Sequence, residues 1–451
     1  MADPVIVWFR QDLRLSDQPA LAAAAKAGPV VGLYVLDDDT PGDWRIGGAQ
    51  RWWLHHSLAA LGAALKEMGV PLVLRRGRAE KVVATVAREI GARTVHALHH
   101  YEPWWKQAEA ALAKADCLDL RLHDGRLLAD PDGIRTGSGG RYRMFTAFWR
   151  ALREQMPPPP PLSVPRGLEG ARQQIAGNAL ADWSLLPTKP DWAGGFDVWT
   201  PGEAGGRAAL HRFRARLDDY DVDRNLPAIE GTSRLSPHLH FGEVSPAAVW
   251  HALCDAGGDP WPFLREVAWR DFASNVVDII PDYGSRNGRD AYDRFPWRRA
   301  DSDFRAWTKG LTGYPIVDAG MRELWATGWM HNRVRMIAAS FLIKHLLIDW
   351  RRGERWFWDT LVDADYGNNA VNWQWVAGTG IDSNPFGRIM APLSQSAKFD
   401  AGDYIRKWVP ELADLPDEAI HDPEARPNGY PEKIIGHREA RERALAAGRK
   451  K

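Results

Sequence analysis

Short apolar runs alternate with helical patterns through the first 130 residues of the chain. Four runs rich in β-branched residues are predicted to be buried strands: Val5–Phe9, Val30–Leu36, Pro71–Leu74 and Thr94–Leu98. Leu118–Leu122 is a plausible fifth strand. Apolar residues recur at helical spacing in three intervening segments: Gln18–Ala27, Gly48–Met68 and Ala79–Ile90. Because strands alternate with helices, we expect an α/β domain with a parallel sheet and right-handed crossovers.

The pattern changes after residue 130. Residues 131–201 are punctuated by Gly and Pro, and the five consecutive prolines Pro157–Pro161 predict a stiff, extended segment. Further on, apolar positions recur at helical spacing almost throughout, most clearly in three segments: Phe263–Val277, Ile316–Thr327 and Met330–Ile348. We therefore predict an α/β domain at 1–130, an inter-domain linker at 131–201 and an all-helical domain at 202–451.

Composition narrows the class of protein. The 451 residues are 45% hydrophobic and 26% charged, which is ordinary for a folded, soluble chain. Cys117 and Cys254 are far apart and lack metal-ligand spacing, so neither a disulfide scaffold nor a metal site is expected. No signal peptide is evident, and Lys344 and Asp349 interrupt the longest apolar stretch. These features predict a soluble, cytoplasmic protein.

Charge and aromatic content point in different directions. The 58 basic and 58 acidic side chains cancel, whereas proteins that bind nucleic acid often carry excess basic charge. A local basic patch can still bind phosphates. The unusual residue is Trp, with 23 copies that lie mostly after residue 180. A special demand for large, flat side chains therefore belongs mainly to the C-terminal part.

One cluster is centred on Arg335. On a helix Asn332, Arg335 and Met336 share a face that leads into an apolar segment. A buried Arg needs a partner or an anionic ligand, because an unpaired buried charge is very costly. Asp363 and Asp365 are the candidate partners. From the residues alone, a structural ion pair and a ligand site both remain open.

A second cluster is the hydroxyl-rich segment Thr232-Ser233-Arg234-Leu235-Ser236. Its hydroxyls, backbone N–H groups and Arg side chain could hold a phosphate or pyrophosphate. The same residue types are equally common as caps at the start of a helix. Both interpretations remain open.

A third cluster consists of Glu266, Trp269 and Arg270, which share one face of a predicted helix. One interpretation is a surface salt bridge beside a half-buried Trp. The other is a site in which Trp269 stacks on a flat ligand while Glu266 accepts its hydrogen bonds, since Trp is used to stack unpaired bases.

Six motifs together resemble the photolyase/cryptochrome family, and they occur in the family's order: WFRQDLRLSDQPAL, EGTSRLSPHLHFGEVSP, TGYPIVDAGMREL, TGWMHNRVRM, WRRGERWFWDTLVDADYGNN and NWQW. The nearest subgroup is the microbial cyclobutane pyrimidine dimer photolyases related to plant cryptochromes. The resemblance implies a Rossmann-like antenna domain followed by an all-α FAD-binding domain. It also implies light-driven DNA repair, in which an electron from reduced FAD splits a flipped-out pyrimidine dimer.

The resemblance assigns residues to the cofactor FAD. Those at its phosphates are Tyr220, Thr232, Ser233, Arg234, Leu235 and Ser236. Those at the flavin are Arg270, Asn332, Arg335, Asp363, Asp365 and Asn369, with Asn369 at the position that faces flavin N5. Asn372 receives no role.

Other positions are assigned to damaged DNA and to electron transfer. The pocket for a flipped dimer would comprise Glu266, Trp269, Asn332, Met336 and Trp375, and Arg224, Arg333 and Arg388 would hold phosphates. The family's electron-transfer chain corresponds to Trp373, Trp350 and Trp297, although each could simply pack in the core. The residues expected to take part in catalysis are therefore Glu266, Asn369, Trp297, Trp350 and Trp373.

Alternatives to repair remain. A cryptochrome-type blue-light receptor would share the fold without repair, but the dimer-pocket positions keep repair-type residues. Enzymes for (6–4) photoproducts carry paired histidines where this chain has His331-Asn332. A flavin electron-transfer protein without DNA would not need the three arginines. We therefore expect UV-damaged DNA as the partner and a monomer, the family default.

The second chromophore is less defined. The Asn-Glu and Cys-Lys pairs that hold methenyltetrahydrofolate in some bacterial photolyases are replaced by Trp104-Trp105 and Tyr283-Gly284. The segments Gln50–Ser57 and Ser383–Asp400 nevertheless resemble the subgroup related to plant cryptochromes, in which folate is common. Methenyltetrahydrofolate is thus the favoured antenna, with a deazaflavin or no antenna as alternatives.

Overall fold

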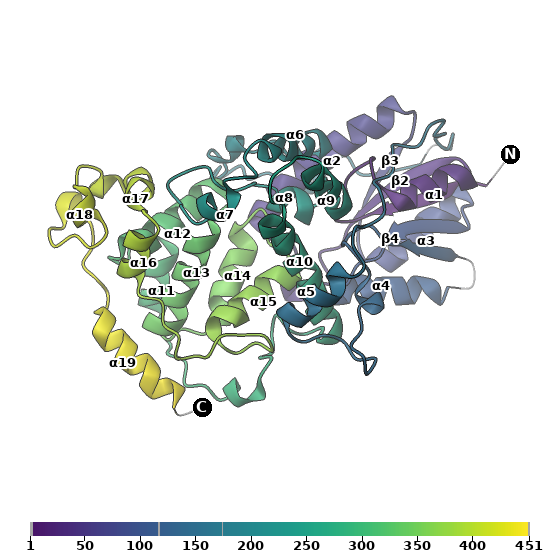
Figure 1. Cartoon of the computed structure of the whole chain (residues 1–451). Coiled ribbons are helices and arrows are strands. Elements are labelled where there is room, and N and C mark those ends of the chain that lie inside the picture. The colour runs from purple at the N-terminus through teal and green to yellow at the C-terminus, as the bar shows by residue number, and fades with distance from the viewer. Residues whose placement is uncertain (1–2, 116–117, 174, 450–451) are drawn as a thin grey trace. The chain divides into compact units, whose positions relative to one another are not determined.

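The structure, a computed structural model, describes residues 3–115, 118–173 and 175–449. Cys117 lies outside the described residues, so the prediction that it does not bind a metal is not addressed by the structure. The chain forms two compact units (Figure 1). The first comprises Met1–Asp191, Trp199–Leu217 and Ser233–Pro281, and the second comprises Trp192–Val198, Asp218–Thr232 and Asp282–Lys451.

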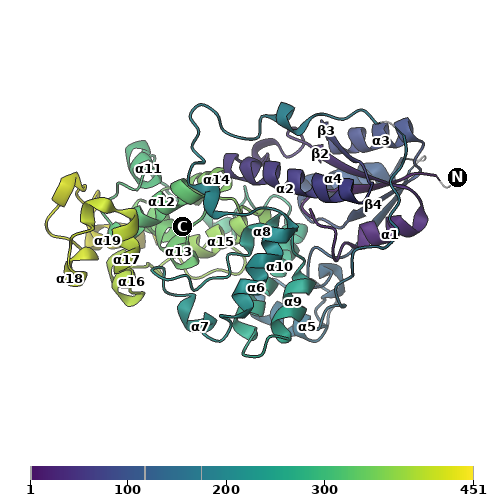
Figure 2. The ribbon, with the colours of Figure 1, turned by 90° about the horizontal axis from the view of Figure 1, so that it is seen from above.

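A five-stranded parallel sheet is the centre of the first unit (Figure 2). Its strands are β1 (Val5–Phe9), β2 (Val30–Leu36), β3 (Leu72–Arg76), β4 (Thr94–Leu98) and β5 (Asp119–His123). The order is β3-β2-β1-β4-β5, and Val5 of β1 pairs with Val30 on one side and Thr94 on the other. Of the three inner strands, β1 and β2 are wholly buried and β4 is buried except at its first residue, whereas the residues of the edge strand β5 are exposed or half-buried. The predicted α/β class is confirmed.

Helices of the first unit surround the sheet and extend the unit beyond it. They are α1 (Pro19–Ala27), α2 (Gly48–Glu67), α3 (Ala79–Ile90), α4 (Pro103–Ala113), α5 (Phe145–Arg153), α6 (Glu203–Arg214), α8 (Ser236–His240), α9 (Pro246–Cys254) and α10 (Trp261–Ile279). Helix α5 lies within the stretch expected to be a connection. It forms because Phe145, Phe148 and Leu152 make one apolar face, which is buried against α10.

The second unit is helical, as predicted, and its described residues contain no strand. Its helices are α7 (Tyr220–Asp223), α11 (Asp301–Thr308), α12 (Pro315–Thr327), α13 (Asn332–Ser340), α14 (Trp350–Thr360), α15 (Tyr366–Ala377), α16 (Pro392–Lys398), α17 (Gly402–Trp408), α18 (Asp417–Ile420) and α19 (His437–Gly448). Short 3₁₀ turns occur in both units: Gly42–Trp44, Pro131–Gly133, Leu180–Trp183, Phe196–Val198, Asp290–Tyr292, Pro410–Leu412 and Pro427–Gly429. Helix α15 packs against both α13 and α14 (Figure 1).

The predicted single helix Met330–Ile348 is wrong in its limits. His331 caps the start of α13, because its ring Nδ1 accepts the backbone N–H of Arg333 at 3.3 Å. After Ser340 the chain widens into a π-helical turn, Phe341–His345, and the helix ends. In this turn Lys344 is fully buried, and its Nζ donates to two backbone carbonyls, those of Ala377 (2.7 Å) and Phe386 (2.9 Å).

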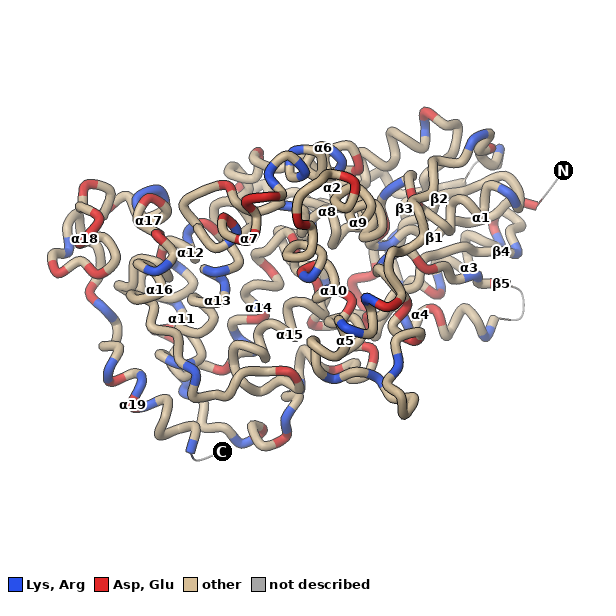
Figure 3. Tube along the Cα trace, in the orientation of Figure 1, with Lys and Arg blue, Asp and Glu red and all other residues tan. Residues whose placement is uncertain are grey.

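Basic and acidic residues are interspersed along the trace of each unit, as the zero net charge suggests (Figure 3). Within the described parts of the chain, no helix is both long and apolar enough to cross a membrane. Nor do three or more His, Cys, Asp or Glu side chains gather there as they would around a metal ion.

Candidate functional site

One face of α14 holds the candidate residues of α15 in place. Gly353 and Phe357 lie on this face with a spacing of four residues, and both contact the indole of Trp373. The ring of Phe357 is 4.9 Å from that of Trp373, and a Cβ at Gly353 would be 2.2 Å from Trp373 Cη2. Asn369, one turn before Trp373, donates from Nδ2 to the Glu354 carbonyl at 3.1 Å. Asn369 and Trp373 are therefore fixed on one surface.

The Glu354 side chain is an unusual component of this interface. It is completely buried, and neither carboxyl oxygen has a hydrogen-bond partner among the described residues. Desolvation by burial raises the pKa of Glu354 well above its ordinary value, and the nearby Arg355 and Arg351 only partly oppose this. Burial therefore favours the neutral, protonated form of this carboxyl group, which belongs to the residue whose backbone carbonyl supports Asn369.

The asparagines of α15 have separate local roles. Asp365 begins the helix, and its carboxylate accepts the backbone N–H of Asn368 at 2.8 Å and its side-chain Nδ2 at 2.9 Å. Asn372 is exposed and donates to the carbonyl of Asn368, four residues earlier, at 2.8 Å. Asn372, which the family resemblance leaves without a role, is thus a solvent-facing residue bonded to its own helix.

Gln374 lies between Trp373 and Trp375 and is fully buried. Its amide nitrogen Nε2 donates to the carbonyls of Tyr283 (2.7 Å) and Arg286 (2.8 Å). Its Oε1 accepts the backbone N–H of Gly288 at 2.8 Å. One side chain therefore fixes the loop 283–288 to α15, a function that sequence reasoning missed although a Gln inside an apolar helical stretch was a signal.

The three candidate tryptophans differ in their surroundings. Trp350 is fully buried and Trp373 nearly so, while Trp297 is half-exposed beside Phe295, with ring centroids 4.3 Å apart. Trp373 is in ring contact with another indole, Trp307, at 6.3 Å. As far as the described residues go, no recorded ring contact joins two of the three candidates directly. Trp307 was not predicted from the sequence.

Arg335 forms a bidentate ion pair with Asp363. Its Nη1 and Nη2 lie 3.1 and 2.9 Å from the two carboxylate oxygens, and its Nε donates to the Met330 carbonyl at 2.7 Å. The side chain of Asp363 is only 4% exposed, whereas that of Arg335 is 23% exposed. Asn332 is exposed and Met336 half-buried on the same face of α13. Asp363 is therefore the partner of Arg335, and because this face of α13 is incompletely covered, the ligand-site interpretation stays a prediction.

One candidate phosphate-binding arginine, Arg333, bonds Asn225, and a second, Arg224, is the chain neighbour of Asn225. The guanidinium of Arg333 donates to Asn225 Oδ1 through both Nε (2.8 Å) and Nη2. Arg224 precedes Asn225 in the chain, and its guanidinium lies over the ring of Tyr220 at 5.1 Å. Residues more than a hundred positions apart are thus brought together. The third arginine, Arg388, is exposed and donates to Asn384 Oδ1 at 3.2 Å.

The hydroxyl-rich segment forms a strained turn. Arg234 has a left-handed backbone with φ of +52°, and Leu235 is right-handed with φ of −84°. Successive residues of opposite hand can form a nest of N–H groups that binds anions. Ser233 Oγ accepts the N–H of Leu235 at 3.2 Å, but no side chain caps α8. The helix-cap interpretation is therefore wrong for the start of α8, and the phosphate-binding interpretation stays a prediction.

Helix α10 carries the third cluster. Trp269 stacks face to face on Phe145 of α5, with ring centroids 3.7 Å apart and planes at 11°. Glu266 is half-buried, and Arg270 donates from Nη2 to the Leu239 carbonyl at 2.9 Å. Phe145, which sequence reasoning missed, therefore orients Trp269.

The following turns of α10 are tied into the rest of the first unit. Asp271 is buried and accepts the backbone N–H groups of Leu128 (2.8 Å) and Ala129 (3.3 Å). Burial raises the pKa of Asp271 to about 7.

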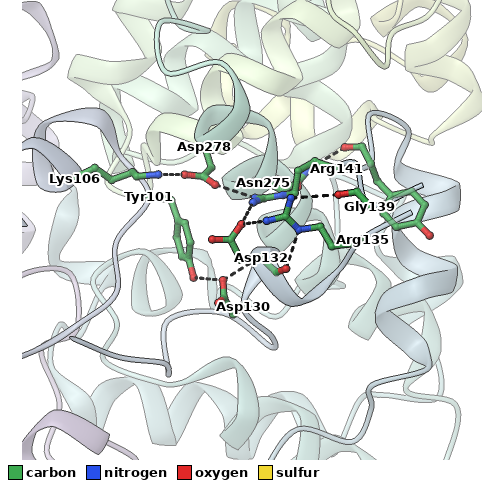
Figure 4. A network of polar contacts seen from close by, with 10 residues as sticks. Tyr101, Lys106, Asp130, Asp132, Arg135, Gly139, Arg141, Asn275 and Asp278 are labelled. Carbon is green, nitrogen blue, oxygen red and sulfur yellow. Dashed lines mark hydrogen bonds and ion pairs between the residues drawn. The ribbon is translucent and has the colours of Figure 1, made fainter. Parts of the chain in front are cut away.

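Beyond Asp271, a polar network holds the end of α10 (Figure 4). Arg141 donates from Nε to Asn275 Oδ1 at 2.8 Å and pairs with Asp278 at 2.9 Å. Asp278 also pairs with Lys106 of α4. Arg141 and Arg135 both contact Asp132. The loop after the sheet, helix α4 and helix α10 are thus bound to one another.

Buried aromatic residues occupy the positions at which some bacterial photolyases hold methenyltetrahydrofolate. Trp104 and Trp105 are both buried, and Trp105 packs edge-on against Trp8 at 5.9 Å. In the second unit Tyr283 is buried, and its hydroxyl accepts the N–H of Ile381 at 2.9 Å. These residues are core residues, so they do not replace the polar groups expected at a folate site of that particular type.

Comparison with known proteins identifies the family. Residues 5–166 match the family described as DNA photolyase, and residues 263–450 match the FAD binding domain of DNA photolyase. The chain is 49% identical to "Deoxyribodipyrimidine photo-lyase" of Agrobacterium fabrum, covering 98% of this chain and 97% of the relative. It is 37% identical to Arabidopsis thaliana "Cryptochrome-1" over 97% of this chain and 69% of that protein. The chain belongs to the photolyase/cryptochrome family.

Solved structures agree. The crystal structure of a bacterial class III photolyase from Agrobacterium tumefaciens superimposes with a TM-score of 0.95 at 48% identity, covering 100% of this chain and 98% of that one. An archaeal photolyase from Sulfolobus tokodaii, described as containing two FAD molecules, has a TM-score of 0.86 at 30% identity and covers 99% of this chain. This chain therefore has the fold of a photolyase and contains the family's FAD-binding domain.

Proposed function

We propose that this protein is a deoxyribodipyrimidine photolyase, which uses light to split cyclobutane pyrimidine dimers in DNA. The observation that carries the proposal is similarity over almost the whole length to proteins of that name. The residue types at the candidate positions support it, because Glu266, Trp269 and Trp375 are those expected of a repair pocket.

FAD is the proposed catalytic cofactor. The strained turn at Arg234 would hold its phosphates together with Tyr220, because a nest of backbone N–H groups and a guanidinium both favour anions. Arg335, Asp363 and Asn369 offer the guanidinium, carboxylate and amide groups that a flavin ring can hydrogen-bond. The full set proposed to bind FAD is Tyr220, Thr232, Ser233, Arg234, Leu235, Ser236, Arg270, Asn332, Arg335, Asp363, Asp365 and Asn369. The chemistry that bound FAD supplies is light absorption and reversible one-electron transfer.

The proposed substrate is a dimer flipped out of the DNA. A dimer stacks poorly, so it costs less to extrude than a normal base pair, and it needs flat apolar walls with a few polar anchors. Trp269 can supply such a wall because Phe145 already holds its ring from one side. The carboxylate of Glu266 would accept hydrogen bonds from the dimer. Asn332, Met336 and Trp375 complete the proposed pocket.

DNA phosphates are proposed to bind Arg224, Arg333 and Arg388. Positioning by phosphate contacts needs only local positive charge, which removes the objection raised by zero net charge. Asn225 would keep the Arg333 guanidinium oriented before DNA arrives.

Trp373, Trp350 and Trp297 are proposed to carry electrons between the surface and the flavin. The half-exposed position of Trp297 suits the outer end, and the burial of the other two suits inner positions. A second chromophore, methenyltetrahydrofolate, is the proposed antenna. The protein is proposed to act as a monomer. Its proposed domains are an antenna domain at 1–130 and an FAD-binding domain at 202–451, joined by a linker at 131–201.

The test is an absorption spectrum followed by illumination with dimer-containing DNA. Flavin bands and light-dependent restoration of thymines are expected, and an absorption band beyond that of flavin would identify the antenna. A preparation without flavin would overturn the FAD assignment. Flavin without repair, in a chemically reduced sample that still shows light-dependent spectral changes, would instead favour a cryptochrome-type receptor.

A further inference from the structure

A chain of hydrogen bonds runs from the buried indole of Trp350 to an exposed carboxylate in the second unit. The indole Nε1–H donates to Asn287 Oδ1 at 3.0 Å, and Asn287 Nδ2 donates to Asp293 Oδ1 at 2.8 Å. Trp350 is 0% exposed and Asn287 is 2% exposed, whereas Asp293 reaches the surface. None of the assigned roles uses Asn287 or Asp293.

The direction of this chain is fixed by chemistry. An indole N–H can only donate, and an ionised aspartate can only accept. The amide of Asn287 must therefore turn its oxygen to Trp350 and its nitrogen to Asp293. The carboxylate polarises the amide, which increases the negative charge on the oxygen that faces the indole.

The cation that lies over the Trp350 ring is itself paired with a carboxylate. The guanidinium carbon of Arg351 lies 4.7 Å from the centre of the Trp350 ring, where its charge would oppose oxidation of the ring. Arg351 is itself paired with Asp349, with both carboxylate oxygens 3.2 Å from Nη1. Asp293 has no ion pair within the described part of the chain. The uncompensated charge coupled to the Trp350 N–H is thus negative.

Trp350 is also well placed to exchange electrons with Trp373. Gly353, on which the Trp373 ring rests, follows Trp350 by three residues on the same face of α14. One helical turn is about 5.4 Å along the axis. Trp350 and Gly353, the residue that the Trp373 ring contacts, therefore lie about one turn apart on the same helix.

We propose that Asn287 and Asp293 are positioning residues that make Trp350 easier to oxidise and hold the positive charge that results. The inference rests on the proposed electron-transfer role of the tryptophans. In the step, Trp350 gives one electron to the oxidised indole of Trp373, which returns to its neutral form. Trp350 becomes a radical cation, no bond breaks, and its Nε1 proton stays in the hydrogen bond to Asn287, because an amide oxygen is a weak base. The oxidant of Trp373 is a light-excited, oxidised flavin, supplied by the proposed function.

The test compares Asp293→Asn with Asp290→Asn in the FAD-loaded protein. Asp290 lies in the same segment and is also exposed, but its carboxylate pairs with Arg286 at 3.4 Å instead of bonding Asn287. We expect D293N to lower the yield of long-lived oxidised tryptophan after a laser flash by roughly 3- to 10-fold, since one partly screened charge is removed. D290N should leave the yield unchanged, and Asp293→Glu should restore it. Equal yields in D293N and D290N would overturn the proposal.

A second measurement does not depend on electron transfer. The ultraviolet resonance Raman difference between wild type and Trp350→Phe isolates the Trp350 indole band that reports hydrogen-bond strength. D293N should shift this band towards a weaker bond, and an unshifted band would also overturn the proposal. The flash experiment on W350F tests the electron-transfer role of Trp350 separately from the positioning role of Asp293. If W350F gives the wild-type yield of oxidised tryptophan, Trp350 does not take part in electron transfer, whatever D293N does to the Raman band.

Discussion

Gly353 of α14 lies directly against the indole of Trp373 in α15. A Cβ at position 353 would approach Cη2 of that ring to 2.2 Å and Leu342 Cδ2 to 2.5 Å. Neither neighbour can move freely, because Trp373 is buried and packs edge-on against both Phe357 and Trp307, and Leu342 is fully buried. The glycine is therefore required by the position of the ring rather than by its backbone conformation.

Gly353→Ala is expected to destabilise the protein by about 1–3 kcal/mol, since overpacking forces the ring or the helices apart. Photoreduction of oxidised flavin should also slow as Trp373 shifts. The matched control is Gly62→Ala in the middle of α2, where the nearest atom is 3.5 Å from the new Cβ. That change should stabilise by about 0.5–1 kcal/mol through backbone entropy. Urea unfolding of both variants measures this difference, and equal stabilities would contradict the packing argument.

Gln374 and Asn372 allow a test of two amides only two residues apart. Gln374→Leu leaves two carbonyls and one N–H of loop 283–288 without partners in a buried site, so we expect a loss of about 3–5 kcal/mol. Asn372→Ala removes only an exposed bond within its own helix and should change stability by less than about 0.5 kcal/mol. The measurement is thermal or urea unfolding. A mild effect of Q374L would show that loop 283–288 does not depend on this clamp.

These residues also show what the sequence could and could not reveal. The strands, most helices and the clusters at Arg335 and Arg234 follow from local periodicity and from residue chemistry. The ion pair between Arg335 and Asp363 was foreseen because a buried charge demands a partner. By contrast, Gly353 has no side chain to signal its contact with Trp373. The role of Asn287 likewise depends on a loop whose path is fixed by Gln374, a long-range contact that no local pattern encodes.

Replacement of Glu354 should change how stability depends on pH. The unfolded chain releases the Glu354 proton near its ordinary pKa of about 4.3. Because burial raises the pKa of Glu354 well above this value, the folded protein holds the proton to a higher pH. The stabilisation from this proton is complete below the unfolded pKa. It is lost as pH rises towards the folded pKa, by up to about 1.4 kcal/mol per pH unit.

Glu354→Gln removes this dependence, so its gain in unfolding free energy over wild type should be larger at pH 8 than at pH 5. Glu418→Gln, at an exposed position of α18, provides the control and should show no such difference. If the difference in unfolding free energy between E354Q and wild type is the same at pH 5 and pH 8, Glu354 does not retain a proton in the folded protein.

DNA binding should depend on Arg333 through its charge. Arg333→Ala is expected to weaken binding of dimer-containing and undamaged DNA alike and to reduce the slope of log K against log salt by about one. Arg224→Ala should behave similarly, because Arg224 lies beside Asn225, which holds Arg333. Arg438→Ala is the control, since Arg438 is 93% exposed on α19 and pairs with Glu442. Fluorescence anisotropy over a salt series makes the comparison, and an unchanged slope in R333A would remove this residue from the DNA-binding surface.

Because the π-helical turn buries Lys344, the rate at which its amine is chemically labelled reports local opening of the structure. The amine is buried and donates to the carbonyls of Ala377, the last residue of α15, and Phe386, so an amine-specific reagent can reach it only when the segment that contains these two residues opens. Exposed lysines such as Lys407 would be labelled at once. The delay before Lys344 reacts therefore counts the spontaneous openings of the segment that follows Trp375, and mass spectrometry can follow these openings in the dark, in light and on DNA.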